Sequence, residues 1–144
     1  MKNNTLWIWL LIFCFFLVVA LFFSTNIQSM KNVNSDIKAI NSEYEEYAKG
    51  KTNGLDITTV INKAINHNEN KLIEKDADGN YVDDENRIVI YITFGGKTYR
   101  MERLYKVGID PFIEYFGSVE FNCVDKKYHD SGMISSLTFE AKEY

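Results

Sequence analysis

The stretch Leu6–Phe23, with the sequence LWIWLLIFCFFLVVALFF, is a run of eighteen apolar residues without a charge, a glycine or a proline. At about 1.5 Å per residue, a helix of this length is about 27 Å long, close to the ~30 Å hydrocarbon core of a bilayer. We therefore predict a transmembrane helix that contacts membrane lipid through Leu6–Phe23. The rest of the chain is then a domain tethered to a membrane.

Two other interpretations of this run are a cleaved signal and a lipoprotein signal. A cleaved secretory signal has an apolar core of about 7–15 residues, followed by small residues at the cleavage site. Here the core is longer and passes through Leu21–Phe23 into Ser24–Asn26, which favours a retained signal anchor. Lipidation at Cys14 is disfavoured because the bulky Phe13 precedes it, so Cys14 is interpreted as a small apolar side chain of the span.

The charges on the two sides of the span nearly balance, so the positive-inside rule gives little guidance on orientation. Lys2 lies on one side, and Lys31, Asp36 and Lys38 lie on the other. A five-residue head (1–5) followed, after the span, by 121 residues is the usual layout of an N-in, C-out protein. We therefore expect a single-pass protein of the cell membrane whose C-terminal domain is extracytoplasmic.

The composition excludes some classes of partner. The net charge of −4 argues against nucleic acid, whose recognition needs a basic surface, and leaves no polybasic patch for anionic lipid. Only Cys123 lies outside the anchor, so an intramolecular disulfide within the domain is excluded. Its place in the alternating run Val119, Phe121, Cys123 indicates a buried structural thiol, with an intermolecular bridge as the open alternative.

The apolar pattern continues past the anchor at helical spacing. The apolar stripe comprises Ile27, Met30, Val33, Ile37, Ile40, Tyr44 and Tyr47. Steps of three and four residues keep this stripe on one side of a helix over about six turns. Because glycine and proline are absent from Leu6 to Lys49 and Gly50 is a natural stop, residues 24–49 are predicted to be an amphipathic helix that continues the anchor. The stripe packs either on the protein's own sheet or on a partner helix, through self-association or with another protein.

The remainder, residues 50–144, is predicted to be a soluble α+β domain. Asp56 has the position of an N-cap, and apolar residues from Ile57 to Ile65 recur at helical spacing, so a second short helix is expected to end near His67. Beyond it the period changes to two, which indicates strands. The predicted strands are Lys71–Lys75, Tyr81–Val82, Arg87–Phe94, Lys97–Tyr105, Ser118–Val124 and Met133–Ala141. The expected fold is thus α+β, with an antiparallel sheet of four to six strands after the helices.

Three of the connections between these strands have recognisable local chemistry. Gly95-Gly96 predicts a hairpin turn, because both glycines accept positive φ. His129–Gly132 is a second turn, and Asp110-Pro111 can begin a helical turn, since proline is tolerated in the first turn of a helix.

The segment 76–86 is rich in side-chain oxygens and resembles a cation-binding loop at first sight. An EF-hand loop needs Gly at position 6 and Glu at position 12. Counted from Asp76, these positions hold Tyr81 and Arg87, so the motif fails. A solvated acidic hairpin and a weak cation site of another kind remain as the two interpretations.

No catalytic, cofactor or metal motif is recognisable. His67 and His129 lack the spacing of a zinc site, and the run His129-Asp130-Ser131 is not a triad, because triads are assembled by the fold. A nucleophile elbow, a phosphate loop and a dinucleotide fingerprint are likewise absent from the sequence. We expect a protein that is not an enzyme and has no cofactor; a small-molecule ligand is neither indicated nor excluded.

The chain contains nine tyrosines and ten phenylalanines, and three aromatic residues lie together near two glycines. This cluster comprises Phe112, Tyr115 and Phe116. Aromatic side chains are enriched in protein interfaces and are also ordinary core residues. The cluster is therefore interpreted either as core or as an interface.

The layout resembles that of pilins and pseudopilins, in which an N-terminal apolar helix continues into an amphipathic helix that packs on an antiparallel sheet. The run Leu6–Phe23 lacks the preceding Gly and the internal Glu of the prepilin processing motif, so the resemblance does not extend to prepilin cleavage. Asn53–Asn68 (NGLDITTVINKAINHN) is also similar to a segment of small single-pass proteins of Gram-positive bacteria.

These observations favour a non-enzymatic, membrane-anchored surface or assembly component, minor-pilin-like in layout, that acts through helix packing and protein–protein contacts. The alternative is an extracytoplasmic ligand-binding or sensing domain on a membrane anchor.

Overall fold

The computed structural model describes the backbone of residues 3–142 and the side chains of residues 7–142. Residues 1–2 of the predicted head and the side chain of Leu6 lie outside the described residues. The chain divides into two compact units, the anchor unit (Met1–Ile37) and the domain (Lys38–Tyr144). The division lies within a helix, so the last turns of that helix belong to the domain.

One helix, α1 (Asn3–Lys49), contains both the predicted anchor and the predicted amphipathic segment. Glycine and proline are absent from its sequence, and the helix ends immediately before Gly50. This confirms the prediction of a long apolar N-terminal helix that continues without a break as an amphipathic helix. Of the helices in the described part of the chain, α1 is the one long and apolar enough to cross a membrane.

A short strand, β1 (Thr52–Asn53), connects α1 to the second helix, α2 (Gly54–Asn70). Asn53, and not Asp56, is the N-cap of α2. Its side chain accepts a hydrogen bond from the Asp56 N–H at 2.9 Å, and the Asp56 carboxylate accepts one from the Asn53 N–H at 3.1 Å. The prediction of the N-cap was three residues late because Asp56 has the other role in this capping box.

The N-terminus of α2 lies directly against the C-terminus of a later helix, α4 (Ile109–Phe116). A Cβ atom at Gly54 would lie 2.0 Å from the backbone oxygen of Phe116, so only glycine can occupy this position. The Leu55 N–H donates a hydrogen bond of 3.3 Å to the carbonyl of Gly117, which joins the two helix ends.

The sheet has five strands in the order β1-β4-β5-β2-β3. The remaining strands are β2 (Val89–Phe94), β3 (Lys97–Arg100), β4 (Glu120–Tyr128) and β5 (Ile134–Ala141). The α+β class and the strand number are confirmed, but the sheet is mixed. β2 and β5 are parallel, with Ile90 opposite Leu137, while the other neighbours are antiparallel.

Three of the six predicted strands differ from the structure. Lys71–Lys75 and Tyr81–Val82 form a single isolated bridge, between Lys75 and Tyr81. The predicted strand Lys97–Tyr105 ends at Arg100 and is followed by a helix, α3 (Met101–Val107). Alternation suggested a strand there, but the adjacent residues Met101 and Glu102 are both buried, which a half-buried strand does not allow.

The core lies on one face of the sheet, where β2, β4 and β5 carry apolar side chains. The fully buried side chains of these strands include Ile90, Ile92, Phe121, Leu137 and Phe139. A register shift at Ser135 of β5, where Lys127 pairs with Ser136 and Tyr128 with Ile134, lets Ile134 and Leu137 both be buried despite their odd spacing. Each buried Ile or Leu side chain contributes about 1.5–3 kcal/mol of transfer free energy.

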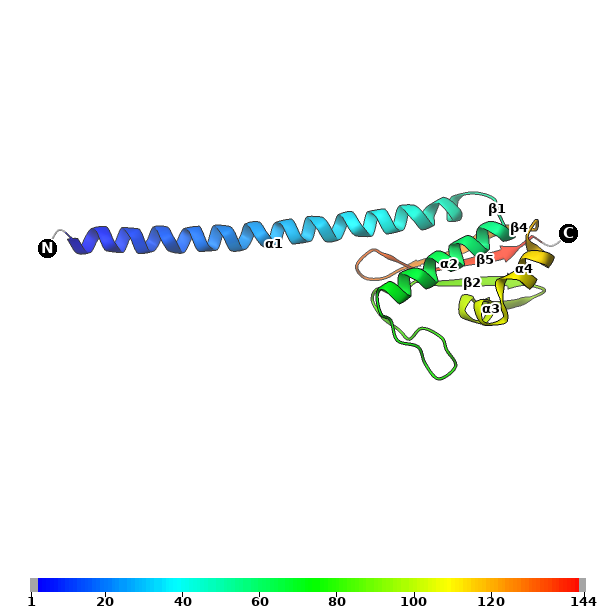
Figure 1. The fold of residues 1–144 in the computed structure, drawn as a ribbon. Coiled ribbons are helices and arrows are strands. Elements are labelled where there is room, and N and C mark those ends of the chain that lie inside the picture. Colours follow the sequence, from blue (N-terminus) through cyan, green and yellow to red (C-terminus); the bar gives the residue numbers. More distant parts are fainter. Residues whose placement is uncertain (1–2, 143–144) are drawn as a thin grey trace. The chain divides into compact units, whose positions relative to one another are not determined.

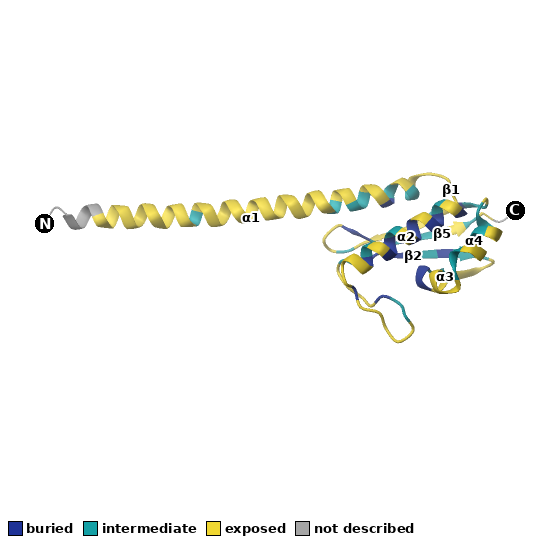
Figure 2. Cartoon of the chain, viewed as in Figure 1, coloured by how far each residue is buried: buried dark blue, intermediate teal, exposed yellow. Residues whose placement is uncertain are grey.

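The second helix covers this apolar face with a stripe of its own, as Figures 1 and 2 show. The stripe comprises Ile57, Val60, Ile61, Ala64 and Ile65, all 2% exposed or less. The helical spacing read from the sequence therefore identified the buried side of α2 correctly.

Candidate functional site

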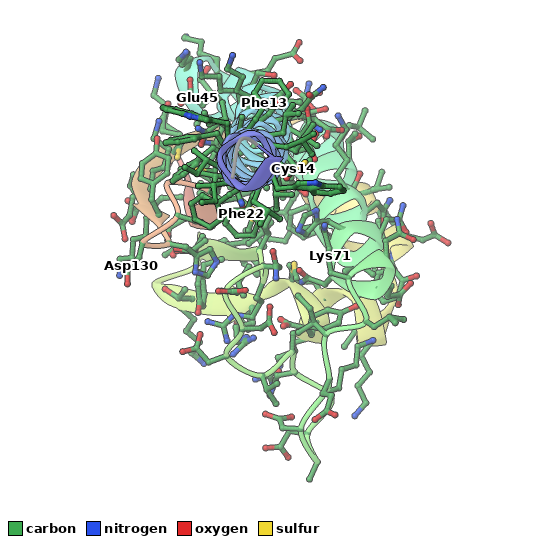
Figure 3. All side chains as sticks on the ribbon, turned by 90° about the vertical axis from the view of Figure 1, so that its left-hand side faces the viewer. Phe13, Cys14, Phe22, Glu45, Lys71 and Asp130 are labelled. Atoms are coloured by element: carbon green, nitrogen blue, oxygen red, sulfur yellow. The ribbon has the colours of Figure 1, made fainter. Side chains whose placement is uncertain are left out.

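The segment of α1 from Trp7 to Phe23 exposes apolar side chains on every side. Apart from the half-buried Val19, its large hydrophobic residues are 40–67% exposed, and none of its most apolar window is buried. In the view along α1, Phe13, Cys14 and Phe22 point to different sides of the helix (Figure 3). Apolar surface of this extent is unfavourable in water, because burial gains about 25 cal/mol per Å². This apolar surface is compatible with the lipid of a bilayer, so this helix can anchor the protein in a membrane.

The residues of the predicted stripe of α1 differ widely in their exposure to solvent. Ile27, Met30 and Val33 belong to the anchor unit and are 53%, 67% and 54% exposed. Tyr44 is only 1% exposed, so it is part of the domain core. The other three members, Ile37, Ile40 and Tyr47, are half-buried. We call Ile27, Met30 and Val33 the open stripe.

The last turns of α1 are held on the domain by polar contacts as well as by Tyr44. The side chain of Asn41 accepts a hydrogen bond of 2.9 Å from the Ile134 N–H and donates one of 2.8 Å to the Gly132 carbonyl. Glu43 forms an ion pair with Lys63 of α2 at 2.8 Å. These contacts link the end of α1 to the start of β5 and to α2.

Three further charged groups and one buried phenol complete this region. The Glu45 carboxylate lies 2.6 Å from Lys49 and 3.7 Å from Lys126, and the hydrogen bond from Lys49 lowers its pKa. Burial raises the pKa of Tyr44 well above its usual range, so this phenol is neutral throughout the physiological range. The sequence did not identify Asn41, because an asparagine on the polar side of an amphipathic helix carries no distinguishing signal.

The aromatic cluster divides in a similar way. Phe112 is 6% exposed, and its ring lies 5.2 Å from that of Phe116 and 6.0 Å from that of Phe121, measured between centroids. Phe116 also packs on Phe94 at 4.5 Å. Phe112 and Phe116 are therefore part of the aromatic packing between α4 and the sheet. Tyr115 is 74% exposed, and it is the member of the cluster that is available for an interface.

The acidic segment 76–86 is organised by hydrogen bonds within its own turn. One carboxylate oxygen of Asp76 accepts hydrogen bonds from the backbone N–H groups of Asn80 at 2.9 Å and Asp78 at 3.0 Å. The bond from Asn80 is the main reason why the pKa of Asp76 is lowered. In the described part of the chain, His, Cys, Asp and Glu side chains nowhere gather in a group of three that could hold a metal.

Both histidines bind backbone carbonyls where this segment enters β2. Nε2 of His67 lies 2.8 Å from the Asn86 oxygen, and Nε2 of His129 lies 2.7 Å from the Arg87 oxygen. The fully buried Asn68 pairs with both backbone groups of Ile88, at 2.7 and 2.9 Å. The two histidines therefore position a chain segment. Burial lowers the pKa of His67, which keeps its ring neutral near pH 7.

Cys123 is half-buried, and burial raises the pKa of its thiol. A thiol with a raised pKa is a poor nucleophile at neutral pH, because the thiolate is the reactive form.

Comparison with known proteins yields no relative. No protein-family model matches the chain, no curated protein is significantly similar to it, and no solved structure matches its fold significantly.

Proposed function

We propose that this protein is a non-enzymatic, membrane-anchored component of a protein assembly, and that it acts through packing of α1 against a partner helix. The observation that carries the proposal is the open stripe, Ile27, Met30 and Val33, which lies beyond the apolar anchor and is more than half exposed. The same stripe contains Tyr44, which the domain covers and which is 1% exposed. Packing on a second helix would remove the open stripe from water.

The anchor unit also sets the geometry of such a contact. Two copies of α1 inserted in one bilayer with the same orientation are parallel, and their apolar spans, beginning near Trp7, lie at the same depth. Ile27, Met30 and Val33 of one copy then lie level with the same residues of the other. A second copy of this chain is thus the simplest partner, and a parallel helix of another single-pass protein would meet the same requirement.

The layout is the one expected of a minor-pilin-like subunit, with α1 as the packing element and the domain (Lys38–Tyr144) presented outside the cytoplasm. In this arrangement the N-terminus is cytoplasmic and the protein belongs to the cell membrane. The location can be tested with a Ser131→Cys variant in which Cys14 and Cys123 are replaced. Labelling of intact cells by a membrane-impermeant thiol reagent is expected, and labelling only after lysis would contradict this location.

The packing itself is tested by photo-crosslinking in native membranes. A benzophenone amino acid at Met30 is expected to give a crosslinked product, and the same group at Asn32, on the polar side of α1, is the control. The double substitution Met30→Glu/Val33→Glu should abolish the product formed from position 27. The matched substitution Gln28→Glu/Asn32→Asp adds the same charge and should preserve it. Equal crosslinking from positions 30 and 32, or none from positions 27, 30 and 33, would contradict the proposal.

A further inference from the structure

A pocket of about 680 Å³ opens in the domain between α3 and the turn that joins Lys75 to Tyr81. Its walls come from the C-terminal half of α2, from this turn and from α3, which all belong to the domain. The pocket contains none of the open-stripe residues, so an activity located here is independent of helix packing by α1. Its volume lies in the range of small-molecule sites, about 300–1,000 Å³.

The base of the pocket is apolar and rigidly held. Ile65 and Tyr81 are each 2% exposed. Beside them, the buried carboxylate of Glu102 accepts hydrogen bonds from Arg100 at 2.7 and 3.2 Å and from the Tyr81 N–H at 3.2 Å. Arg100 also donates to the Tyr81 carbonyl at 3.2 Å. The charge of Glu102 is therefore matched by Arg100, and the base is fixed before any ligand arrives.

The mouth of the pocket carries cations that lack acidic partners. Arg103 and Lys106 are exposed and lie three residues apart on α3, so they share one side of that helix. Among the ion pairs of the described residues, neither takes part in one, although most other cations of the domain do. Two cations without an acidic partner lie at one opening, in a chain whose net charge is −4, and the Arg103 guanidinium lies 5.6 Å from the centroid of the Tyr99 ring.

Other residues of the mouth define the ligand further. Lys75 is partly neutralised by Glu69 at 3.7 Å, and its ammonium group lies 4.6 Å from the centroid of the Tyr81 ring. Asp78 contributes one negative charge from the turn. A single acidic group therefore suits this opening better than a polyanion does. Tyr105, at 50% exposure, adds apolar ring surface on the α3 side.

We propose that this pocket binds a small organic acid, with its apolar or aromatic body against Tyr105, above the base formed by Tyr81 and Ile65, and with its carboxylate on Arg103 and Lys106. The planar guanidinium of Arg103 can donate two parallel hydrogen bonds to a carboxylate, and Lys106 adds a second positive charge. Contact with the half-exposed ring of Tyr105 supplies affinity by removing apolar surface of the ligand from water. This inference goes beyond the assembly function and does not depend on it.

The test uses the full chain, ¹⁵N-labelled, in nanodiscs of zwitterionic lipid, titrated with 4-phenylbutyrate. The neutral 4-phenylbutyramide, which has the same body, is the matched control. The carboxylate is expected to give saturable backbone shifts at Gly79, Asn80 and Lys106, and the amide to bind at least about tenfold more weakly. Equal affinity for the acid and the amide, or no saturable shifts with millimolar acid, would overturn the proposal.

Paired variants locate the site. Arg103→Glu/Lys106→Glu should weaken binding of 4-phenylbutyrate by more than about tenfold. Lys71→Glu/Lys97→Glu changes the net charge equally at two exposed lysines outside the pocket, and it should leave the affinity unchanged. Preserved resonances of the core in both variants show that the fold is intact. An equal loss in both pairs would mean that the overall field of the protein, and not the pocket, attracts the acid, and would overturn the proposal. Because crosslinking through α1 is measured separately, failure here leaves the proposed assembly function untouched.

Discussion

The two ends of the apolar stripe on α1 have the same spacing and opposite surroundings. At one end, Ile27, Met30 and Val33 are more than half exposed, whereas toward the other end Tyr44 is 1% exposed and belongs to the core of the domain (Figure 2). Helical spacing determines which residues share a side of a helix, and it acts identically at both ends. It therefore cannot tell whether that side is covered by the protein itself.

The polar residues around the stripe distinguish the two ends. Near Tyr44, two polar side chains of α1 have partners in other segments of the domain: Asn41 binds the backbone of Ile134, and Glu43 binds Lys63. Such contacts fix the register of a helix on the surface that it covers. At the other end, the side chains of Thr25 and Asn26 bond to backbone carbonyls of the preceding turn of α1 itself. Asn41 and Glu43, beside the covered part of the stripe, thus bind other segments of the domain. Thr25 and Asn26, before the open part, bind only α1 itself.

The largest expected effect comes from truncating the stripe at its covered end. Tyr44→Ala removes a fully buried aromatic side chain and should lower the free energy of unfolding of the domain by about 3 kcal/mol. Met30→Ala, at the open end, should change it by less than about 0.5 kcal/mol. Chemical denaturation of the full chain in detergent micelles, followed through near-ultraviolet circular dichroism, measures both. Similar losses for the two variants would show that the two ends are not different.

Much of this fold could be predicted from local pattern. The unbroken α1, the buried side of α2 and the hairpin at Gly95-Gly96 follow from spacing, from the absence of breakers and from two glycines, which have φ of 56° and 69°. Each of these features depends on residues close together in sequence. The parallel pairing of β2 with β5 does not, because β3, α3, α4 and β4 intervene between them. Local periodicity contains no information about which distant strand becomes the neighbour.

A second, smaller effect is expected at the hydrogen bonds that hold the covered end. Asn41→Ala leaves the buried Ile134 N–H without its partner and should lower the free energy of unfolding by about 1–2 kcal/mol. Asn34→Ala changes the same residue type two turns earlier, where the side chain is exposed, and should have an effect within about 0.5 kcal/mol. Amide hydrogen exchange at Ile134 should become faster in Asn41→Ala only. Unchanged exchange there would mean that Asn41 does not hold the start of β5.

The candidate sites were less predictable than the fold. The sequence suggested Phe112, Tyr115 and Phe116 as one cluster, but only Tyr115 is well exposed, because Phe112 and Phe116 are four residues apart and face the sheet together. The pocket beside Glu102 had no sequence signal at all. Its parts come from α2, the turn after Lys75 and α3, and the predicted strand Lys97–Tyr105 would have placed Arg103 and Lys106 elsewhere. A site assembled from three separate segments becomes visible only when the fold is known.

The smallest expected effect is a loss of stability in mild acid that is confined to the domain. Burial lowers the pKa of His67 below its ordinary value of 6.5, against a smaller opposing effect of the Asn86 carbonyl. As the pH falls through about 6.5, the unfolded chain binds a proton at this position before the folded domain does. Stability is therefore complete above this pH and decreases below it, until the folded-state histidine is protonated as well. A further loss is expected only in stronger acid, where carboxylates with lowered pKa, such as Glu45 and Asp76, become protonated.

This acid effect separates the two units, because histidine is absent from residues 1–37. His67→Gln keeps an N–H that can donate to the Asn86 carbonyl and removes the titration, so its free energy of unfolding should be flatter between pH 7 and 5 than that of the native chain. Across the same range, the helical signal of a peptide covering residues 7–37 in lipid should stay constant. A native domain whose stability does not change between pH 7 and 5 would contradict the role of His67. A parallel change in the anchor peptide would show that the acid acts on the lipid system and not on this histidine.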